Sequence, residues 1–173
     1  SALPLPPQVY EGEWRQGVHH GQGSMHISDG NRYTGQWKLG KKNGSGTMTY
    51  PDGARYEGSW VDDHRHGQGT YSYSSGAVYD GGWEEGRMHG TGCYTSGSAS
   101  RASSANSDSF LLSSGAVEAR MAHLGGRTYV GEWADGVRNG YGTDTLSNGI
   151  IFEGSFKQDK KHGVGTLRSA DGG

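Results

Sequence analysis

An aromatic-x-Gly-x-aromatic motif occurs six times along the chain, and its spacing constrains the fold more than any other feature. The copies begin at Tyr10, Tyr33, Tyr56, Tyr79, Tyr129 and Phe152. The first four copies are 23 residues apart, and so are the last two. A fixed period of this size indicates a repeat array, in which each unit buries its apolar surface only against its neighbours.

Composition limits the size of the hydrophobic core. Only 31% of the 173 residues are hydrophobic, whereas 33 are Gly. The large apolar residues are mainly Tyr and Trp at fixed positions of the repeat, so we expect a thin aromatic spine. The net charge of −2 provides no general attraction to nucleic acid or to an anionic membrane. The single cysteine, Cys93, excludes an internal disulfide framework and fits a reducing compartment.

The repeat that begins at Tyr33 shows the structure expected for each unit. Tyr33, Gly35 and Trp37 alternate with polar residues, which places them on one face of a strand. The polar segment 38–43 turns the chain into a second alternating strand, 44–50, and a Pro-Asp-Gly turn follows. The sequence therefore predicts an all-β fold, an elongated single-layer antiparallel meander of β-hairpin repeats. With strands about 4.8 Å apart, six repeats would span about 60 Å.

The Gly residues inside these strands predict close packing. A side chain at Gly35 would project from the same face as Tyr33 and Trp37, so its absence leaves room for an aromatic ring from the adjacent strand. We interpret Gly44 and Gly46 of the second strand in the same way. We also expect these second-strand Gly residues to let the sheet curl, so that its aromatic face becomes concave.

These residues resemble the MORN repeat, whose pattern is near Y-x-G-x-W-x-x-G-x-x-x-G-x-G-x-x-x-x-x-D-G. Segments 10–32 and 33–55 match almost throughout, and the other four repeats match at the aromatic pair and the Gly positions. The resemblance implies an elongated β-hairpin array that serves as a scaffold, a partner-binding groove or a dimerisation module. It also implies a cytoplasmic setting in a cytoskeletal or membrane-associated assembly.

The period is interrupted after the fourth repeat, where 27 extra residues precede Tyr129 in the second strand or its turn. The predicted divisions are an extended lead-in, four repeats, an insertion and two repeats, at 1–9, 10–95, 96–124 and 125–173. Within the insertion, the Ser-rich part predicts a flexible loop, whereas 115–124 predicts a short amphipathic helix.

Two roles for the insertion follow from its composition. The helix covers an exposed strip of the sheet, or Phe110-Leu111-Leu112 and the helix occupy the aromatic trough, where they imitate or exclude a partner. Beyond the insertion, Asp144 stands where other repeats carry Met, Tyr or Leu. This substitution predicts a weaker second strand in the fifth repeat.

The predicted function is that of a non-enzymatic scaffold, which binds an extended or helical protein segment along the aromatic trough. The residues predicted to line this trough are Tyr10, Trp14, Tyr33, Trp37, Tyr56, Trp60, Tyr79, Trp83, Tyr129 and Trp133. The alternative is that every one of these rings packs between repeats and contacts no ligand, with the tyrosine hydroxyl ends in contact with water.

Two other interaction surfaces are predicted. Basic residues near the turn within most hairpins predict an edge for anionic phospholipid headgroups, each contributing about 1 kcal/mol. This basic edge comprises Lys41, Lys42, Arg65, Arg87, Arg138, Lys160 and Lys161. The open C-terminal edge near Phe152 and Phe156 predicts homodimerisation, because an unpaired strand invites pairing with another chain.

A His residue recurs at one position of the repeat, and a column of such residues could bind a metal ion. Its members precede a second-strand Gly, at His20, His66, His89 and His162. Asn43 and Asn139 replace His in the other two repeats, and Asn is a poor zinc ligand. Equivalent positions also lie about 9.6 Å apart, too far to share one ion. We therefore interpret these His residues as turn residues and predict no metal and no cofactor.

Catalytic motifs are weak in this sequence. No Ser-His-Asp or Cys-His pattern stands apart from the repeats, and Cys93 holds an ordinary strand position. The Gly-x-Gly pairs precede no helix, so they do not predict a phosphate loop. Nucleic-acid binding requires aromatic side chains on a basic surface, which the net charge does not favour. We expect no enzymatic activity in this segment and no nucleic-acid partner.

Overall fold

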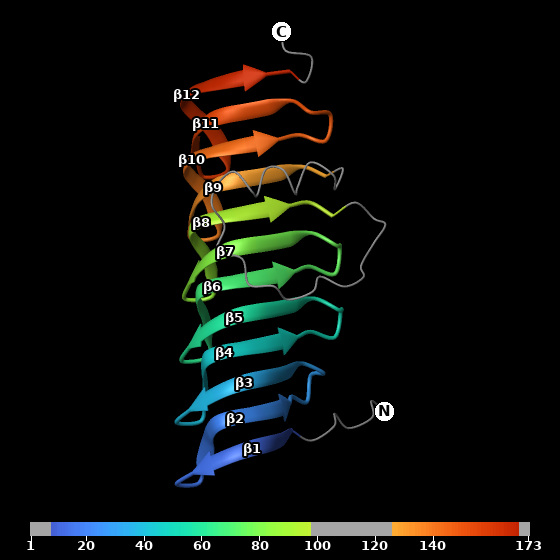
Figure 1. Cartoon of the computed structure of the whole chain (residues 1–173), viewed down its shortest axis with the longest axis vertical. Helices are drawn as coiled ribbons and strands as arrows, with labels where there is room; N and C mark the ends of the chain where they lie inside the picture. The colour runs from blue at the N-terminus through green and yellow to red at the C-terminus, as the bar shows by residue number, and fades with distance from the viewer. Residues whose placement is uncertain (1–7, 98–125, 170–173) are drawn as a thin grey trace, which may run out of the picture.

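The chain folds into one open sheet of antiparallel strands, shown in Figure 1. The computed structural model describes residues 8–97 and 126–169. The strands are β1 (Val9–Arg15), β2 (Val18–His26), β3 (Arg32–Lys38), β4 (Lys41–Thr49), β5 (Arg55–Val61), β6 (His64–Ser72), β7 (Val78–Glu84), β8 (Arg87–Thr95), β9 (Thr128–Ala134), β10 (Val137–Thr145), β11 (Ile151–Lys157) and β12 (Lys160–Arg168). Each strand pairs with its neighbours in sequence, so the predicted single-layer meander of hairpins is confirmed.

Each repeat is a hairpin of a seven-residue strand and a nine-residue strand, and the registers repeat along the array. In β3 and β4, Tyr33 pairs with Met48, and Gly35 pairs with Gly46. Gly46 also pairs with Gly58 of the next repeat. The aromatic and Gly positions therefore form straight columns that run across all repeats.

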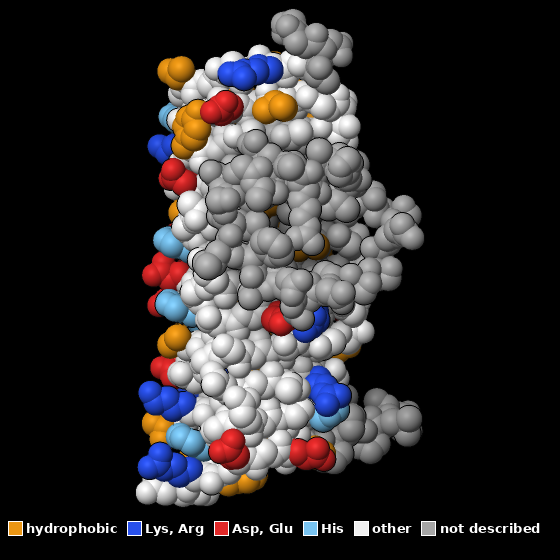
Figure 2. All heavy atoms as spheres, in the orientation of Figure 1, with side chains coloured by type: hydrophobic (Ala, Val, Ile, Leu, Met, Phe, Trp, Pro, Cys, Tyr) orange, Lys and Arg blue, Asp and Glu red, His pale blue; other side chains and the backbone are white. Residues whose placement is uncertain are grey.

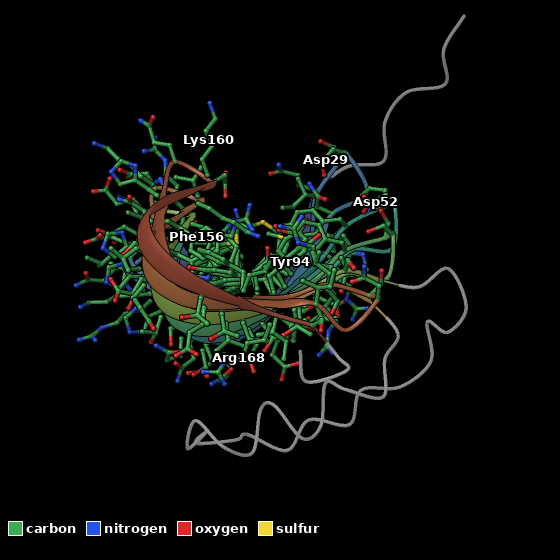
Figure 3. All side chains as sticks on the ribbon, turned by 90° about the horizontal axis from the view of Figure 1, so that it is seen from above. Asp29, Asp52, Tyr94, Phe156, Lys160 and Arg168 are labelled. Atoms are coloured by element: carbon green, nitrogen blue, oxygen red, sulfur yellow. The ribbon has the colours of Figure 1, made fainter. Side chains whose placement is uncertain are left out.

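A bulge in each hairpin bends the sheet. Between β3 and β4, one residue, Gln36, lies opposite three residues, 43–45. Gly44 within this bulge has a φ of 77°, a left-handed conformation that favours glycine. The Gln36 side chain accepts a hydrogen bond from the Ser45 backbone N–H at 2.8 Å. Because bulges bend and twist strands, their repetition curls the sheet into the open trough seen in Figure 3.

A second kind of Gly, represented by the paired Gly35 and Gly46, makes room for an aromatic ring. A Cβ added to Gly46 would overlap the ring of Tyr33 on the adjacent strand, as expected from the sequence. A Cβ added to Gly35 would overlap Gly46 and the Tyr33 hydroxyl. The same Tyr ring therefore covers both Gly residues of its hairpin.

The insertion lies in the turn between β8 and β9, and it leaves both strands complete. Tyr94 pairs with Tyr129, and Thr95 pairs with Thr128, in the register found between other repeats. The predicted helix at 115–124 and Phe110-Leu111-Leu112 lie outside the described residues. The sheet therefore continues across the insertion without a change of phase.

The prediction of a weaker strand at Asp144 is wrong. The strand β10 has the usual nine residues, and Asp144 pairs with Tyr129 and Phe152 on its two sides. Its side chain is 1% exposed. Two oxygens of its carboxylate accept hydrogen bonds from Arg127, at 2.7 and 2.6 Å. This paired carboxylate takes the place of an apolar side chain, which sequence periodicity alone could not anticipate.

Candidate partner-binding surface on the concave face

The aromatic residues of the motif form an unbroken spine along the inside of the trough. Tyr33 lies edge-on to Trp37 of its own repeat and to Trp60 of the next, with ring centroids 5.1 and 5.3 Å apart. The same alternation crosses the insertion, where Tyr79 and Trp133 are 5.3 Å apart. Edge-to-face pairs of this kind contribute about 0.5–1.5 kcal/mol each beyond their area burial.

Hydrogen bonds hold the eight inner Tyr and Trp rings of the spine in place. The Tyr33 hydroxyl donates to the Gln36 carbonyl at 2.9 Å, and the Trp37 indole N–H donates to the Gly23 carbonyl of the preceding repeat at 3.2 Å. The expectation that the hydroxyl ends contact water is therefore wrong for the inner repeats. Burial raises the pKa of Tyr33 and of its counterparts, and it raises the pKa of Tyr129 to about 12.

Eight of the ten residues predicted to line the trough lie within this spine and are at most 7% exposed. They are Tyr33, Trp37, Tyr56, Trp60, Tyr79, Trp83, Tyr129 and Trp133. At the first repeat, Trp14 is 58% exposed and Tyr10 is half-buried. The eight inner rings are packed between repeats, so a partner in the trough would contact other side chains.

A second set of aromatic residues lies over the spine, on the side of the trough. Tyr50, Tyr71, Tyr73 and Tyr94 come from the ends of second strands and the turns that follow, and all four are half-buried. The Tyr71 and Tyr73 ring centroids are 4.5 Å apart, and Tyr50 and Tyr94 lie 5.8 and 6.2 Å from the nearest member. We call these four residues the tyrosine row. Tyr94 is visible inside the trough in Figure 3.

Sequence reasoning missed the tyrosine row as a binding surface. Its signal was present, because second-strand residues two apart lie on one face. The first repeat carries Met25 and Ile27 at these two positions, whereas the third carries Tyr71 and Tyr73. The aromatic-x-Gly-x-aromatic motif does not include these positions, so it does not show this variation between repeats.

A hollow of about 320 Å³ opens beside the tyrosine row. Its lining includes Arg65, Tyr71, Tyr73, Trp83 and Met88. Arg87 also lines it, so the hollow has aromatic walls and two charged groups, which provide both apolar contact and orientation for a bound group. This hollow and the tyrosine row together form the candidate site.

The seven residues predicted as a lipid edge do not lie together on one exposed edge. Lys42, Arg65, Arg138 and Lys161 extend over the aromatic rings of the trough. Arg65 lies 4.3 Å from the Trp83 centroid, and Lys161 lies 4.3 Å from that of Phe152. Cation–π contacts of this kind hold these side chains inside the trough.

The remaining basic residues of that set are exposed but alternate with acidic groups. Lys41 and Lys160 lie at hairpin turns, and Arg87 pairs with Asp135 at 3.3 Å. Figure 2 shows basic, acidic, His and hydrophobic side chains mixed along this edge. Lipid binding stays a prediction, and the geometry does not assemble a basic strip for it.

The predicted oligomer edge is placed differently from the expectation. Phe156 is 3% exposed and belongs to β11, which is paired on both sides. At the C-terminal end of the described sheet, the open edge is β12, where Val164 is 88% exposed. Phe152 and Phe156 are therefore spine residues, and homodimerisation stays a prediction.

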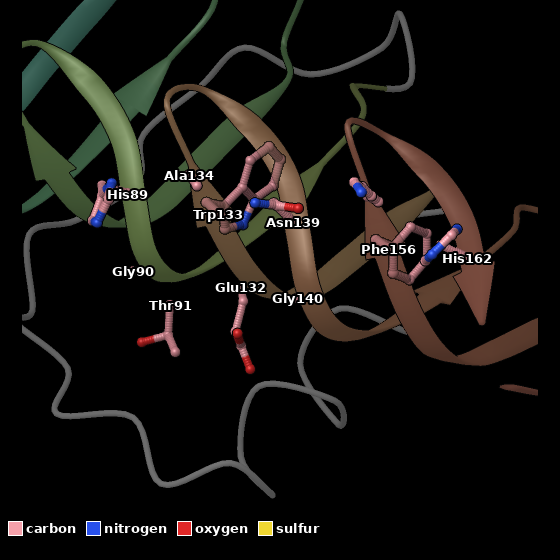
Figure 4. A pocket seen from close by; sticks show the side chains of 11 residues that line it. His89, Gly90, Thr91, Glu132, Trp133, Ala134, Asn139, Gly140, Phe156 and His162 are labelled. Carbon is pink, nitrogen blue, oxygen red and sulfur yellow. The ribbon is translucent and has the colours of Figure 1, made fainter. Parts of the chain in front are cut away.

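Two members of the His column line a hollow of about 760 Å³, together with the spine residues Trp133 and Phe156. His89 and His162 come from β8 and β12, and Asn139 of β10 lies between them, as Figure 4 shows. His89 lies 3.3 Å from the Glu84 carboxylate. Within residues 8–97 and 126–169, no three His, Cys, Asp or Glu side chains are grouped as metal ligands. Burial raises the pKa of the Cys93 thiol to about 11, so it stays protonated near neutral pH.

The fold and the spine define an open array of repeated β-hairpins with an aromatic interior. The MORN repeat family model matches six segments of the chain, at residues 10–32, 33–55, 56–78, 79–101, 129–150 and 152–173. The chain therefore belongs to the MORN repeat family. No helix in the described part of the chain is long and apolar enough to cross a membrane.

Comparison with known proteins found similarity among solved structures. None of the curated proteins compared with this chain matches it. Among solved structures, the chain is similar to the TCP domain of SAS-4 (dCPAP) of Drosophila melanogaster, solved in complex with a proline-rich motif of Ana2 (dSTIL). The two chains are 14% identical with a TM-score of 0.46, and the alignment covers 88% of this chain and 69% of the other.

Proposed function

We propose that this chain is a non-enzymatic scaffold module that binds a protein segment, extended or helical, along its concave face. The observation that supports the proposal is the tyrosine row, which packs over the buried spine and stays half-buried, with part of its surface open. Tyrosine is enriched at binding surfaces because its ring gives a large rigid contact area and its hydroxyl gives a polar one.

The length of the tyrosine row sets the length of the bound segment. The row extends from the end of β4 to the end of β8, which is four strand spacings or about 19 Å. A segment of about six extended residues or about thirteen helical residues covers this distance. The partner motif is therefore short, and longer contacts would engage Met25 at one end or Arg138 at the other.

The setting of this function follows from the family rather than from the site. We infer a cytoplasmic protein within a cytoskeletal or membrane-associated assembly, in which the array holds a partner at a defined place.

A peptide selection tests the proposal. A phage-displayed library of random twelve-residue peptides is panned against the whole chain, and selected peptides are titrated against variants. The double variant Y71M/Y73I introduces residues that the chain itself carries at these positions, in Met48 and Ile27. We expect it to bind at least tenfold more weakly with an unchanged thermal unfolding midpoint.

The control variant is Gln68→Glu, whose side chain is exposed on the opposite face of β6. It should leave affinity unchanged. Failure to select any peptide, or equal binding by Y71M/Y73I and the unaltered chain, would contradict the proposal.

A further inference from the structure

Two of the cations inside the trough, Lys42 and Arg138, are paired by a carboxylate from the next hairpin turn. Lys42 Nζ lies 3.9 Å from the Asp63 carboxylate. Arg138 Nε lies 3.1 Å from Asp159 Oδ1, and Arg138 Nη2 donates to the Asp159 carbonyl at 2.7 Å. The backbone N–H of each Asp also donates to the backbone carbonyl of its basic partner, Asp63 to Lys42 and Asp159 to Arg138. This arrangement links successive hairpins by charge as well as by backbone.

Arg65 lacks this carboxylate because Gly86 stands at the equivalent place in the next turn. Arg65 Nη2 donates to the Gly86 carbonyl at 2.7 Å, and the Gly86 N–H donates to the Arg65 carbonyl, as in the other hairpins. Across the described ranges, no carboxylate forms an ion pair with Arg65. Asp52 on the opposite rim accepts a hydrogen bond from the Ala54 N–H instead.

The unpaired guanidinium borders the hollow beside the tyrosine row. Its Cζ lies 4.3 Å from the Trp83 centroid and 5.2 Å from that of Tyr71. The ring faces attract the cation but supply no counter-charge. A guanidinium in such an environment gains most from a carboxylate, which accepts two of its N–H groups in one plane.

We infer that the hollow at Arg65 receives the carboxylate of an Asp or Glu side chain in the bound segment, with an apolar neighbour packed on Tyr71 and Tyr73. This inference rests on the proposed function and specifies the chemistry of its partner. The partner side chain completes in trans the ion pair that Asp63 and Asp159 complete within the chain.

Two substitutions test the inference with residues already used in the array. Arg65→Met introduces the residue that Met88 provides in the next repeat. Gly86→Asp introduces the missing internal carboxylate and leaves Arg65 in place. Gly86 has a φ of 81° and open space at Cβ, and Asp63 and Asp159 already adopt this left-handed conformation at the equivalent positions, with φ values of 72° and 63°.

The probes are the selected twelve-residue peptides and, for each, a variant with its acidic residue replaced by the amide. We expect selected peptides to share an Asp or Glu next to an apolar residue. Arg65→Met, Gly86→Asp and the peptide amide should each weaken binding about tenfold or more. Combining the amide with either protein variant should add little, because all three remove the same ion pair.

A matched control separates this ion pair from a general charge effect. Gly40→Asp adds the same charge at the equivalent turn beside His19, and Gly40 has a φ of 81°. It should leave peptide affinity unchanged. Equal weakening by Gly40→Asp and Gly86→Asp, or equal weakening of acid and amide peptides by Gly86→Asp, would overturn the inference.

The two proposals fail in different ways. Peptides that lose affinity for Y71M/Y73I but not for Arg65→Met or Gly86→Asp would support the partner-binding function and overturn the carboxylate site. Peptides indifferent to Y71M/Y73I would overturn the function itself, together with the inference that depends on it.

Discussion

Gly46 shows how single residues hold the spine together, because the Tyr33 ring lies where its side chain would be. We expect Gly46→Ala to lower the free energy of unfolding by about 1–3 kcal/mol, since overpacking displaces a ring that is fixed on both sides. Urea denaturation measures this change. The nearest atom to the added methyl is the Tyr33 hydroxyl oxygen. Gly46→Ala should therefore destabilise less in a Tyr33→Phe background, and an equal effect in both backgrounds would contradict the packing explanation.

Asp144 is a buried charge, and its effect on the stability of the chain depends on the arginines that pair with it. Asp144→Asn should destabilise the chain by about 2 kcal/mol, because it leaves Arg127 and Arg138 without the carboxylate that joins them. This value is below that of a fully buried pair, since Arg127 is partly exposed. The double variant R127A/D144Y copies Ala54 and Tyr71, the residues at the equivalent positions around Tyr56. It should regain most of the lost stability, and a double variant no more stable than Asp144→Asn would contradict this account.

At the scale of elements, the insertion lies between two correctly paired strands. The connection from β8 to β9 is residues 96–127, whereas that from β6 to β7 is residues 73–77. Replacing 96–126 by 73–76, which keeps Arg127 beside Asp144, should preserve the sheet and stabilise it by about 1.5 kcal/mol, because a shorter loop closes at a smaller entropic cost. Thermal unfolding of the shortened chain measures this. A large loss of stability would show that the insertion contributes packing of its own.

The elements were predictable because one period sets both strands and turns. Alternation around Gly35 assigned the faces, and the Pro-Asp-Gly segment assigned a turn. The site was predictable only in part. The sequence pattern predicted rings such as Trp60 as binding residues, but Trp60 is buried by contacts with the neighbouring repeat. It did not indicate that Arg65 lies over Trp83, because that contact joins different repeats and depends on the curl of the sheet.

At the scale of the whole molecule, the buried tyrosines couple stability to alkaline pH. Burial raises the pKa of these hydroxyls above the usual value of 10.0, so the folded chain holds their protons more tightly than the unfolded chain. The resulting stability is complete below about pH 10 and is lost as the pH rises above it. For Tyr129 the loss extends to about pH 12.

We therefore expect cooperative unfolding above about pH 10, accompanied by ionisation of the spine tyrosines. Tyrosinate absorbance and circular dichroism, followed together against pH, measure both events. In the variant Tyr129→Phe, which copies Phe152, the loss of stability with pH should be shallower. Ionisation of every tyrosine near pH 10 with the sheet intact would contradict the expectation.

The sequential strand order also determines how the array would respond to tension. The first and last strands lie at opposite ends of the sheet (Figure 1), and antiparallel hydrogen bonds run perpendicular to the strands. A pull on the two ends therefore acts along the hydrogen bonds and loads the ladders in series. The edge strands would peel away one hairpin after another at low force, and each step would release one repeat of chain. The array then acts as an extensible link, whose bound segment would clamp the hairpins beneath it.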